Sequence, residues 1–90
     1  MAVEYKNLME EIVLQNLDAA MAAGDCCTCD ICKSDVVAYA LNHLPPRYVA
    51  THQGRLMVRA KSYETQFRAD VMSALGKAVM VVGQAPHHDR

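Results

Sequence analysis

Four cysteines gathered in one short stretch are the residues of this chain that point most directly to chemistry. Cys26, Cys27, Cys29 and Cys32 fall within seven consecutive positions. Disulfide frameworks of secreted domains join segments that are far apart in sequence, so this spacing favours a metal site. Thiols separated by two and three positions allow one loop to surround a tetrahedral ion with three sulfur ligands. Zinc is the expected metal, because it prefers sulfur ligands and needs no redox chemistry.

The fourth ligand of such a site has more than one candidate. Cys26 is adjacent to Cys27, and neighbouring side chains of an extended loop point apart, so both reach one ion only with a particular backbone turn. His87 or His88 near the end of the chain could close the site instead. A fully ligated zinc would be structural, since catalysis needs an open position. The other interpretations of the cluster are reduced thiols without a metal, a redox-active thiol pair, or an iron–sulfur cluster.

The sequence predicts one helix before the cysteine-rich stretch and another after it. Apolar residues recur at three- and four-residue spacings over about residues 4–23, which predicts an amphipathic helix. Gly24 follows where a left-handed residue is expected to end the helix, and residues 25–33 are predicted to form a loop. Ser34 is the expected cap of a second helix, which Pro45 and Pro46 must end. A zinc ion in the loop would therefore tie the two helices together.

The second half of the sequence predicts a small β element and a last helix. Residues 48–52 and 55–60 favour strands, and apolar residues alternate with polar ones in the second run, so we expect a short hairpin. Ser62 is the expected cap of the last helix, and Gly83 its end. Gly76 inside this helix suggests close approach by another element, such as a second subunit. The predicted buried face of the last helix consists of Phe67, Val71, Leu75, Ala78, Val79 and Val82.

Composition narrows the classes of function. Ninety residues suffice for one domain, which we place over residues 1–90 with a core at about 4–82 and a polar, frayed tail at 83–90. The formal net charge of −1 argues against nucleic-acid binding. Membrane spans need about 18 uninterrupted apolar residues, which this sequence lacks. The first residues do not resemble a signal peptide, so a soluble, cytoplasmic protein is expected. Paired carboxylates, a phosphate-binding glycine loop and a nucleophile–base set are all missing, so we expect no enzymatic activity.

Three strings of the sequence resemble the ComFB family of late competence development proteins. They are KNLMEEIV at residues 6–13, DVVAYALNHLPPRYV at 35–49 and RADV at 68–71, and the similarity spans about residues 4–82. The resemblance implies a mainly helical homodimer with a small β element, in which Cys27, Cys29 and Cys32 match the zinc-binding thiols. It implies no enzymatic activity. Members are implicated as receptors for cyclic dinucleotides such as c-di-GMP or c-di-AMP. The resemblance therefore implies that this protein binds such a messenger and signals to a downstream regulatory protein in bacterial competence or motility.

A receptor for a cyclic dinucleotide needs cations for two phosphates, hydrogen-bonding side chains for base edges and a flat group for stacking. Arg47 and Tyr48 are the strongest candidates, because the rigid proline pair fixes where they project. Asn42 could merely cap a helix end, and the other polar candidates could be solvated surface residues. A twofold dimer would match the approximate symmetry of the ligand. The candidate ligand-binding residues are Lys6, Asn42, Arg47, Tyr48, Arg59, Lys61, Arg68 and Asp70.

In one alternative function the protein binds zinc but no small-molecule ligand. Six methionines and a high apolar content suit an adaptable surface that receives a partner helix. The chain would then be a zinc-binding protein–protein interaction module. Calorimetric titration with cyclic dinucleotides separates the two functions.

Overall fold

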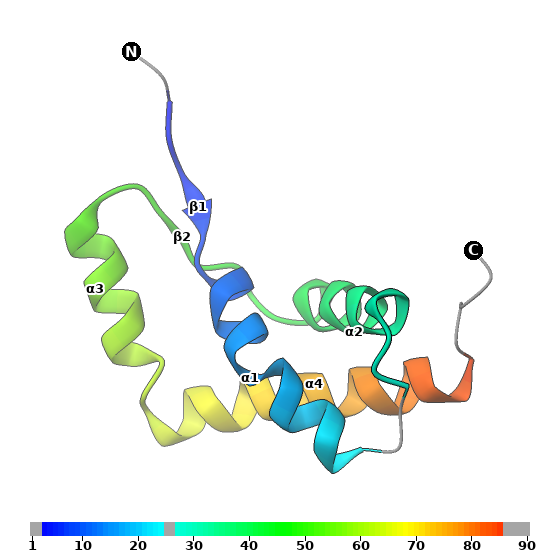
Figure 1. Cartoon of the computed structure of the whole chain (residues 1–90). Coiled ribbons are helices and arrows are strands. Elements are labelled where there is room, and N and C mark those ends of the chain that lie inside the picture. The colour runs from blue at the N-terminus through cyan, green and yellow to red at the C-terminus, as the bar shows by residue number, and fades with distance from the viewer. Residues whose placement is uncertain (1–2, 25–26, 86–90) are drawn as a thin grey trace.

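Helices α1, α2 and α4 enclose the core. α1 (Met9–Ala23) and α2 (Asp30–Asn42) pack along α4 (Thr65–Gln84) and against each other. Figure 1 shows α4 running below α2 and crossing behind α1. The structure, a computed structural model, describes residues 3–24 and 27–85. In this part of the chain, no helix combines the length and the apolar character that crossing a bilayer demands.

The apolar stripes that the sequence predicts supply this core. All six residues predicted for the last helix are buried on α4. Burying a Leu or Val side chain contributes about 1.5–3 kcal/mol, so these stripes are the main source of stability. A stripe along α1 packs with Val36, Ala40 and Leu44, and Leu8 is fully buried just before that helix. The buried residues of α1 are Met9, Ile12, Val13, Leu17, Ala20 and Met21.

The first helix begins at Met9 and not near Glu4, because the preceding residues join a sheet. β1 (Lys6–Asn7) pairs antiparallel with β2 (Tyr48–Val49). In the register, Lys6 is opposite Val49 and Asn7 is opposite Tyr48. Tyr5, which lies within the helix predicted over about residues 4–23, precedes α1 and is exposed.

The Asn7 side chain joins the strand pair to α1. Its Oδ1 atom accepts the backbone N–H of Met9 at 3.2 Å and that of Arg47 at 2.8 Å. The backbone N–H of Leu8 donates to the carbonyl oxygen of Arg47 at 2.7 Å. Asn7 therefore satisfies a donor at the start of α1, where helical N–H groups lack partners within the helix.

The second helix begins earlier than expected. Cys29 is its N-terminal cap residue in an extended conformation, and α2 starts at Asp30. Ser34, the expected cap, lies inside the helix and donates its hydroxyl to the carbonyl oxygen of Asp30 at 2.8 Å. The predicted loop over residues 25–33 is therefore wrong at its C-terminal end. Since α2 ends at Asn42, before the two prolines, the predicted end is confirmed.

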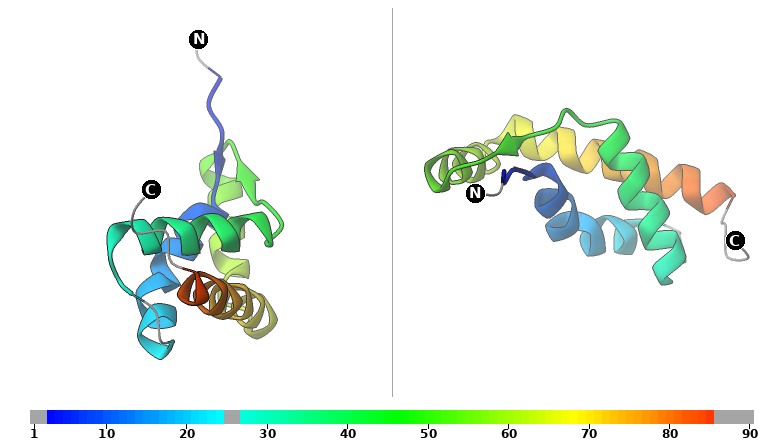
Figure 2. Two further views of the ribbon diagram at one scale, coloured as in Figure 1. Left: turned by 90° about the vertical axis from the view of Figure 1, so that its right-hand side faces the viewer. Right: turned by 90° about the horizontal axis from the view of Figure 1, so that it is seen from above.

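The predicted hairpin is wrong. Residues His52–Lys61 form a helix, α3, and β2 pairs with β1. Thr51 caps α3, because its Oγ1 atom accepts the backbone N–H of Gly54 at 3.0 Å. Val58 is the only β-branched residue of α3, so the intrinsic preference of the segment is helical. α3 lies at the opposite end of the molecule from α2 (Figure 2).

The boundaries of α4 also differ from the prediction. Ser62 caps the end of α3, where its hydroxyl donates to the carbonyl oxygen of Arg59 at 2.6 Å. Glu64 precedes the first residue of α4, and the helix continues through Gly83 to Gln84. The predicted tail therefore starts later, and residues 86–90 lie outside the described part.

Gly24 plays a role other than the predicted one, and Gly76 meets no other element of the described part of its own chain. Gly24 has φ −101° and ψ 172°, so it is extended and not left-handed. A Cβ atom on Gly24 would stand 2.4 Å from Val79 Cγ1, so close approach by α4 requires the glycine. Gly76, expected to meet another element, has nothing within 4 Å of a Cβ atom among the described residues.

Candidate metal centre

Three cysteine side chains converge at the junction of α1 and α2. The Sγ atoms of Cys27, Cys29 and Cys32 all lie within 4.8 Å of one another. In a tetrahedral zinc site with Zn–S bonds of about 2.3 Å, ligand sulfur atoms are about 3.8 Å apart. Small side-chain adjustments would bring the three sulfur atoms to that spacing. These residues could therefore hold a metal ion, and three sulfur donors suit a soft tetrahedral ion such as zinc.

The start of α2 positions two of the three thiols. Cys29 caps the helix and Cys32 lies in its first turn, so a spacing of three residues places both side chains on one side of the helix. Cys27 approaches from the connection that follows α1. Cys32 is fully buried in the core, Cys29 is half-buried and Cys27 is exposed. An ion held here would link the α1–α2 connection to the core.

The electrostatics of the cluster differ between its members. The pKa of the Cys29 thiol lies below its usual value, chiefly because the backbone N–H of Cys32 donates to its sulfur. Burial, followed by hydrogen bonds with the neighbouring thiols, raises the pKa of Cys32 to about 12. A bound divalent cation favours the thiolate form of every ligand, so metal binding would release protons from this cluster.

The candidates for a fourth ligand cannot be placed beside these thiols. Cys26, His87 and His88 lie outside the described residues. The three described cysteines thus account for three sulfur donors, and the fourth ligand stays a prediction.

A second polar cluster joins β1, α1 and α3. The Glu11 carboxylate accepts from Lys6 Nζ through one oxygen and from Arg59 Nη2, at 2.8 Å, through the other. The hydrogen bond from Lys6 and the charges of Lys6, Arg59 and Arg55 hold the pKa of Glu11 below its usual value. Because three cations surround one carboxylate, the cluster carries net positive charge. No local pattern in the sequence pointed to Glu11.

Two exposed aromatic rings lie on the strand pair that also carries Lys6. The rings of Tyr5 and Tyr48 meet edge to face with centroids 6.1 Å apart, and they are 71% and 64% exposed. Pairing of β1 with β2 brings the two rings together, and Lys6 follows Tyr5 in the chain. Strand pairing therefore gathers Lys6, Tyr48 and Arg59 at the end of the molecule formed by β1, β2 and α3 (Figure 1).

Arg47 directly precedes β2 and is half-buried against Phe67 of α4. Its guanidinium carbon is 5.5 Å from the centroid of the Phe67 ring, within the range of a cation–π contact. Arg47 Nε is buried without a hydrogen-bond partner among the described residues. Arg47 and Asp70 both line a small cavity of about 30 Å³. The structure thus brings Asp70 close to Arg47. The Asp70 carboxylate accepts a hydrogen bond from Gln66, with Nε2 at 2.8 Å from Oδ1.

The remaining ligand candidates lie elsewhere. Arg68 lines a different hollow, together with Ile12 and Tyr63. Asn42 is the exposed last residue of α2, and Lys61 is the exposed last residue of α3. Arg59 and Lys61 both lie on the helix α3, where the sequence predicted a hairpin.

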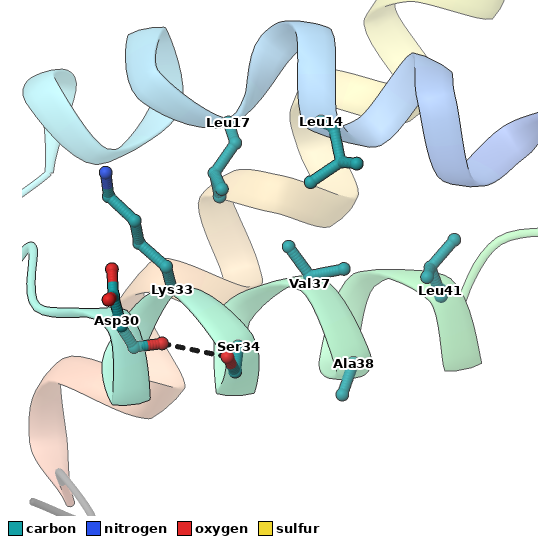
Figure 3. Close-up of a pocket in the computed structure, with 8 residues that line it drawn as sticks. All are labelled: Leu14, Leu17, Asp30, Lys33, Ser34, Val37, Ala38 and Leu41. Carbon is teal, nitrogen blue, oxygen red and sulfur yellow. Dashed lines mark hydrogen bonds between the residues drawn. The ribbon is translucent and has the colours of Figure 1, made fainter.

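An apolar groove runs between α1 and α2. It has a volume of about 530 Å³, and Leu14 and Leu17 face Val37 and Leu41 across it (Figure 3). Lys33 lies at the end nearest the cysteines, with its Nζ atom 3.7 Å from Asp18 Oδ1. Its apolar lining consists of aliphatic residues, whereas the sequence favoured a methionine-rich surface.

The fold and this site define a small helical domain whose first inter-helix junction carries a cysteine cluster able to bind a metal. The profile of the family described as late competence development protein ComFB matches residues 6–86. The chain belongs to this family, and the resemblance found in the sequence is confirmed.

Known relatives agree with this assignment. The competence protein ComFB of Bacillus subtilis (strain 168) is 29% identical over 87 residues, which cover 96% of this chain and 86% of that protein. A solved structure, described as the structural characterization of the late competence protein ComFB from Bacillus subtilis, superposes with a TM-score of 0.83. It shares 27% sequence identity, and the match covers 94% of both chains. The predicted fold class, mainly α with a small β element, is confirmed.

Proposed function

We propose that this ComFB-family protein is a non-enzymatic, cytoplasmic regulator that works as a zinc-stabilised homodimer. It binds a cyclic dinucleotide, c-di-GMP or c-di-AMP, and passes the signal to a downstream protein of a competence- or motility-type pathway. The zinc ion is structural, held by Cys27, Cys29 and Cys32 with a fourth ligand from Cys26, His87 or His88.

The observation that carries the ligand proposal is the exposed tyrosine pair at the end of the molecule that also holds the cations Lys6 and Arg59. Stacking of a base on an aromatic side chain contributes about 1–3 kcal/mol, and Tyr48 offers such a surface next to Tyr5. Lys6 and Arg59 supply donors for a phosphate, which would compete with Glu11 for them. Arg47 keeps an unused buried donor close to the same strands.

Support for the homodimer comes from α3. Its side chains of Leu56 and Met57 are 53% and 68% exposed, and exposed apolar surface of this kind is typical of an interface. Every charged residue of α3 is basic, whereas every charged residue of α1 is acidic. We place α3 of a second copy along the groove between α1 and α2, where its apolar side chains contact the aliphatic lining and the opposite charges of α3 and α1 favour the approach of the two copies. A twofold axis would repeat this contact and the ligand site.

Calorimetric titration tests the ligand proposal. Zinc-loaded protein is titrated with c-di-GMP and with c-di-AMP, and saturable binding of one of them is expected. Tyr48→Ala should weaken that binding on the order of tenfold or more. The matched control is Tyr63→Ala, because Tyr63 is an equally exposed tyrosine outside the strand pair. Absence of binding to both dinucleotides, or an equal loss in the two variants, would contradict the proposal.

The groove between α1 and α2 also favours the second function, a protein–protein interaction module without a small ligand. Its apolar lining and elongated shape suit an amphipathic helix (Figure 3). In that case the titrations give no heat, and replacing Leu14 by Asp abolishes capture of the partner while the zinc content stays unchanged.

A further inference from the structure

Two members of the cysteine cluster have the arrangement of a thiol pair that can form a disulfide. Cys29 and Cys32 enclose the first turn of α2 as a Cys-X-X-Cys sequence. Their Sγ atoms lie within 4.8 Å of each other on the same side of the helix. A disulfide bond is about 2.05 Å long, so rotation of the two side chains must bring the sulfur atoms together.

The exposure of the two thiols differs in a way that orders their reactions. Cys29 is half-buried at the tip of the helix, so a small solute can reach its sulfur. Cys32 is fully buried in the core behind it. Of these two thiols, an oxidant in solution therefore reaches Cys29 first, and Cys32 is held in place to react with the oxidised sulfur.

We propose that Cys29 and Cys32 form an oxidation site, at which a peroxide converts the two thiolates to a disulfide and thereby releases the metal ion. The inference rests on the zinc site of the proposed function. It does not depend on the cyclic dinucleotide. Occupancy of the metal site then follows the redox state of the compartment.

The chemistry balances with hydrogen peroxide as the oxidant. The Cys29 thiolate attacks one peroxide oxygen, the O–O bond breaks, and the leaving hydroxide takes up a proton to become water. The Cys32 thiolate then attacks the Cys29 sulfur of the sulfenic acid. The S–S bond forms, the S–O bond breaks, and a second hydroxide leaves as water after protonation. The two sulfur atoms lose two electrons in total, and the peroxide gains them.

The consequence for the fold is local. A disulfide removes two of the three described sulfur donors, so Cys27 and the fourth ligand hold the ion poorly. The connection between α1 and α2 loses its anchor, while the helices keep their apolar contacts with α4. We therefore expect the oxidised protein to remain folded and to lose only the stability that zinc adds.

The test is peroxide treatment of the zinc-loaded protein in the presence of a chromophoric zinc chelator. One zinc ion should be released per chain, and the intact mass should fall by two hydrogen atoms. Dithiothreitol followed by zinc should restore the starting state. Cleavage before Asp25 and Asp30 separates Cys29 from Cys32, so their disulfide joins two peptides. A disulfide between Cys27 and Cys29 would stay within one peptide, and fragmentation of the joined peptides identifies which cysteine of residues 25–29 is bonded to Cys32.

Two variants, prepared without metal, test the oxidation site independently of the zinc site. Metal-free Cys27→Ser protein should still form the disulfide, because the reacting pair is intact. Metal-free Cys29→Ser protein should not, and circular dichroism verifies that both variants are folded. If the purified protein takes up no zinc but the disulfide forms, the metal proposal fails and the thiol pair stands. A disulfide that involves Cys27, or zinc release without a disulfide, would overturn the oxidation site.

Discussion

The Arg59 guanidinium lies 2.8 Å from the Glu11 carboxylate, and this ion pair joins α3 to the start of α1 across 48 residues of sequence. The same carboxylate accepts from Lys6 of β1. No residue of α3 is fully buried, and Val58 is its half-buried contact with the core. Through these two ion pairs, Glu11 links the strand pair and α3 to helix α1.

Acidification should weaken this attachment. The folded-state pKa of Glu11 is lowered, mainly by the Lys6 hydrogen bond, so its contribution to stability is complete above the unfolded pKa of about 4.3. That contribution is lost as the pH falls through the folded value. We expect Glu11→Gln to be less stable than the wild type at neutral pH. The difference should vanish below the folded-state pKa, as urea unfolding at several pH values will show.

Glu10→Gln is the matched control for this titration, because Glu10 is an exposed carboxylate on the same turn of α1. Its effect at neutral pH should be smaller than that of Glu11→Gln. Equal pH profiles for the two variants would show that Lys6 and Arg59 do not stabilise the fold through Glu11.

Gly24→Ala should destabilise the protein through a clash and not through backbone strain. The new Cβ atom would stand 2.4 Å from Cγ1 of the buried Val79. Overpacking of this kind costs about 1–3 kcal/mol. The loss is measured as a lower free energy of unfolding in urea. An unchanged free energy would mean that the connection after α1 can move away from α4.

Gly76→Ala is the opposite case and serves as the control. A Cβ atom there meets nothing within 4 Å, and Ala favours a helix interior by about 0.5–1 kcal/mol over Gly. The variant should therefore be more stable. A destabilised Gly76→Ala protein would indicate that a second copy packs against this turn of α4.

Leu56→Glu should dissociate the proposed dimer. The substitution places a charge on the exposed apolar face of α3, and we expect the dissociation constant to rise at least tenfold, which is about 1.4 kcal/mol. Sedimentation equilibrium measures it. Ala69→Glu adds the same charge to an exposed position of α4 and should leave the dimer intact. A wild-type protein that is monomeric at all concentrations would contradict the proposal.

The sequence sufficed for those parts of the fold that depend on local spacing. The buried stripe of α4 follows from a helical period over 20 residues, and all six predicted residues are buried. The cysteine cluster was predictable for the same reason, because Cys27, Cys29 and Cys32 are neighbours in sequence and meet without help from distant segments.

The parts that depend on distant contacts were not predictable from local patterns. Part of α3, residues 55–60, was interpreted as a strand because Leu56, Val58 and Ala60 occupy alternate positions, although over its full length the segment is amphipathic as a helix. No residue of α3 is fully buried, so a buried stripe does not mark it. Lys6 continues a helical pattern, yet it pairs with Val49 in the sheet. The contacts of Glu11 with Arg59, and of Arg47 with Phe67, likewise need the assembled fold.

Native mass spectrometry of the purified protein, before and after treatment with a chelator, is the most direct test of the metal centre. We predict one zinc ion per chain, its loss together with a lower unfolding temperature after chelation, and recovery of both when zinc is returned. Cys29→Ser should reduce the zinc content in the same measurement. A chain that is purified without metal, takes up no zinc and unfolds at the same temperature throughout would contradict the assignment of Cys27, Cys29 and Cys32 as a metal site.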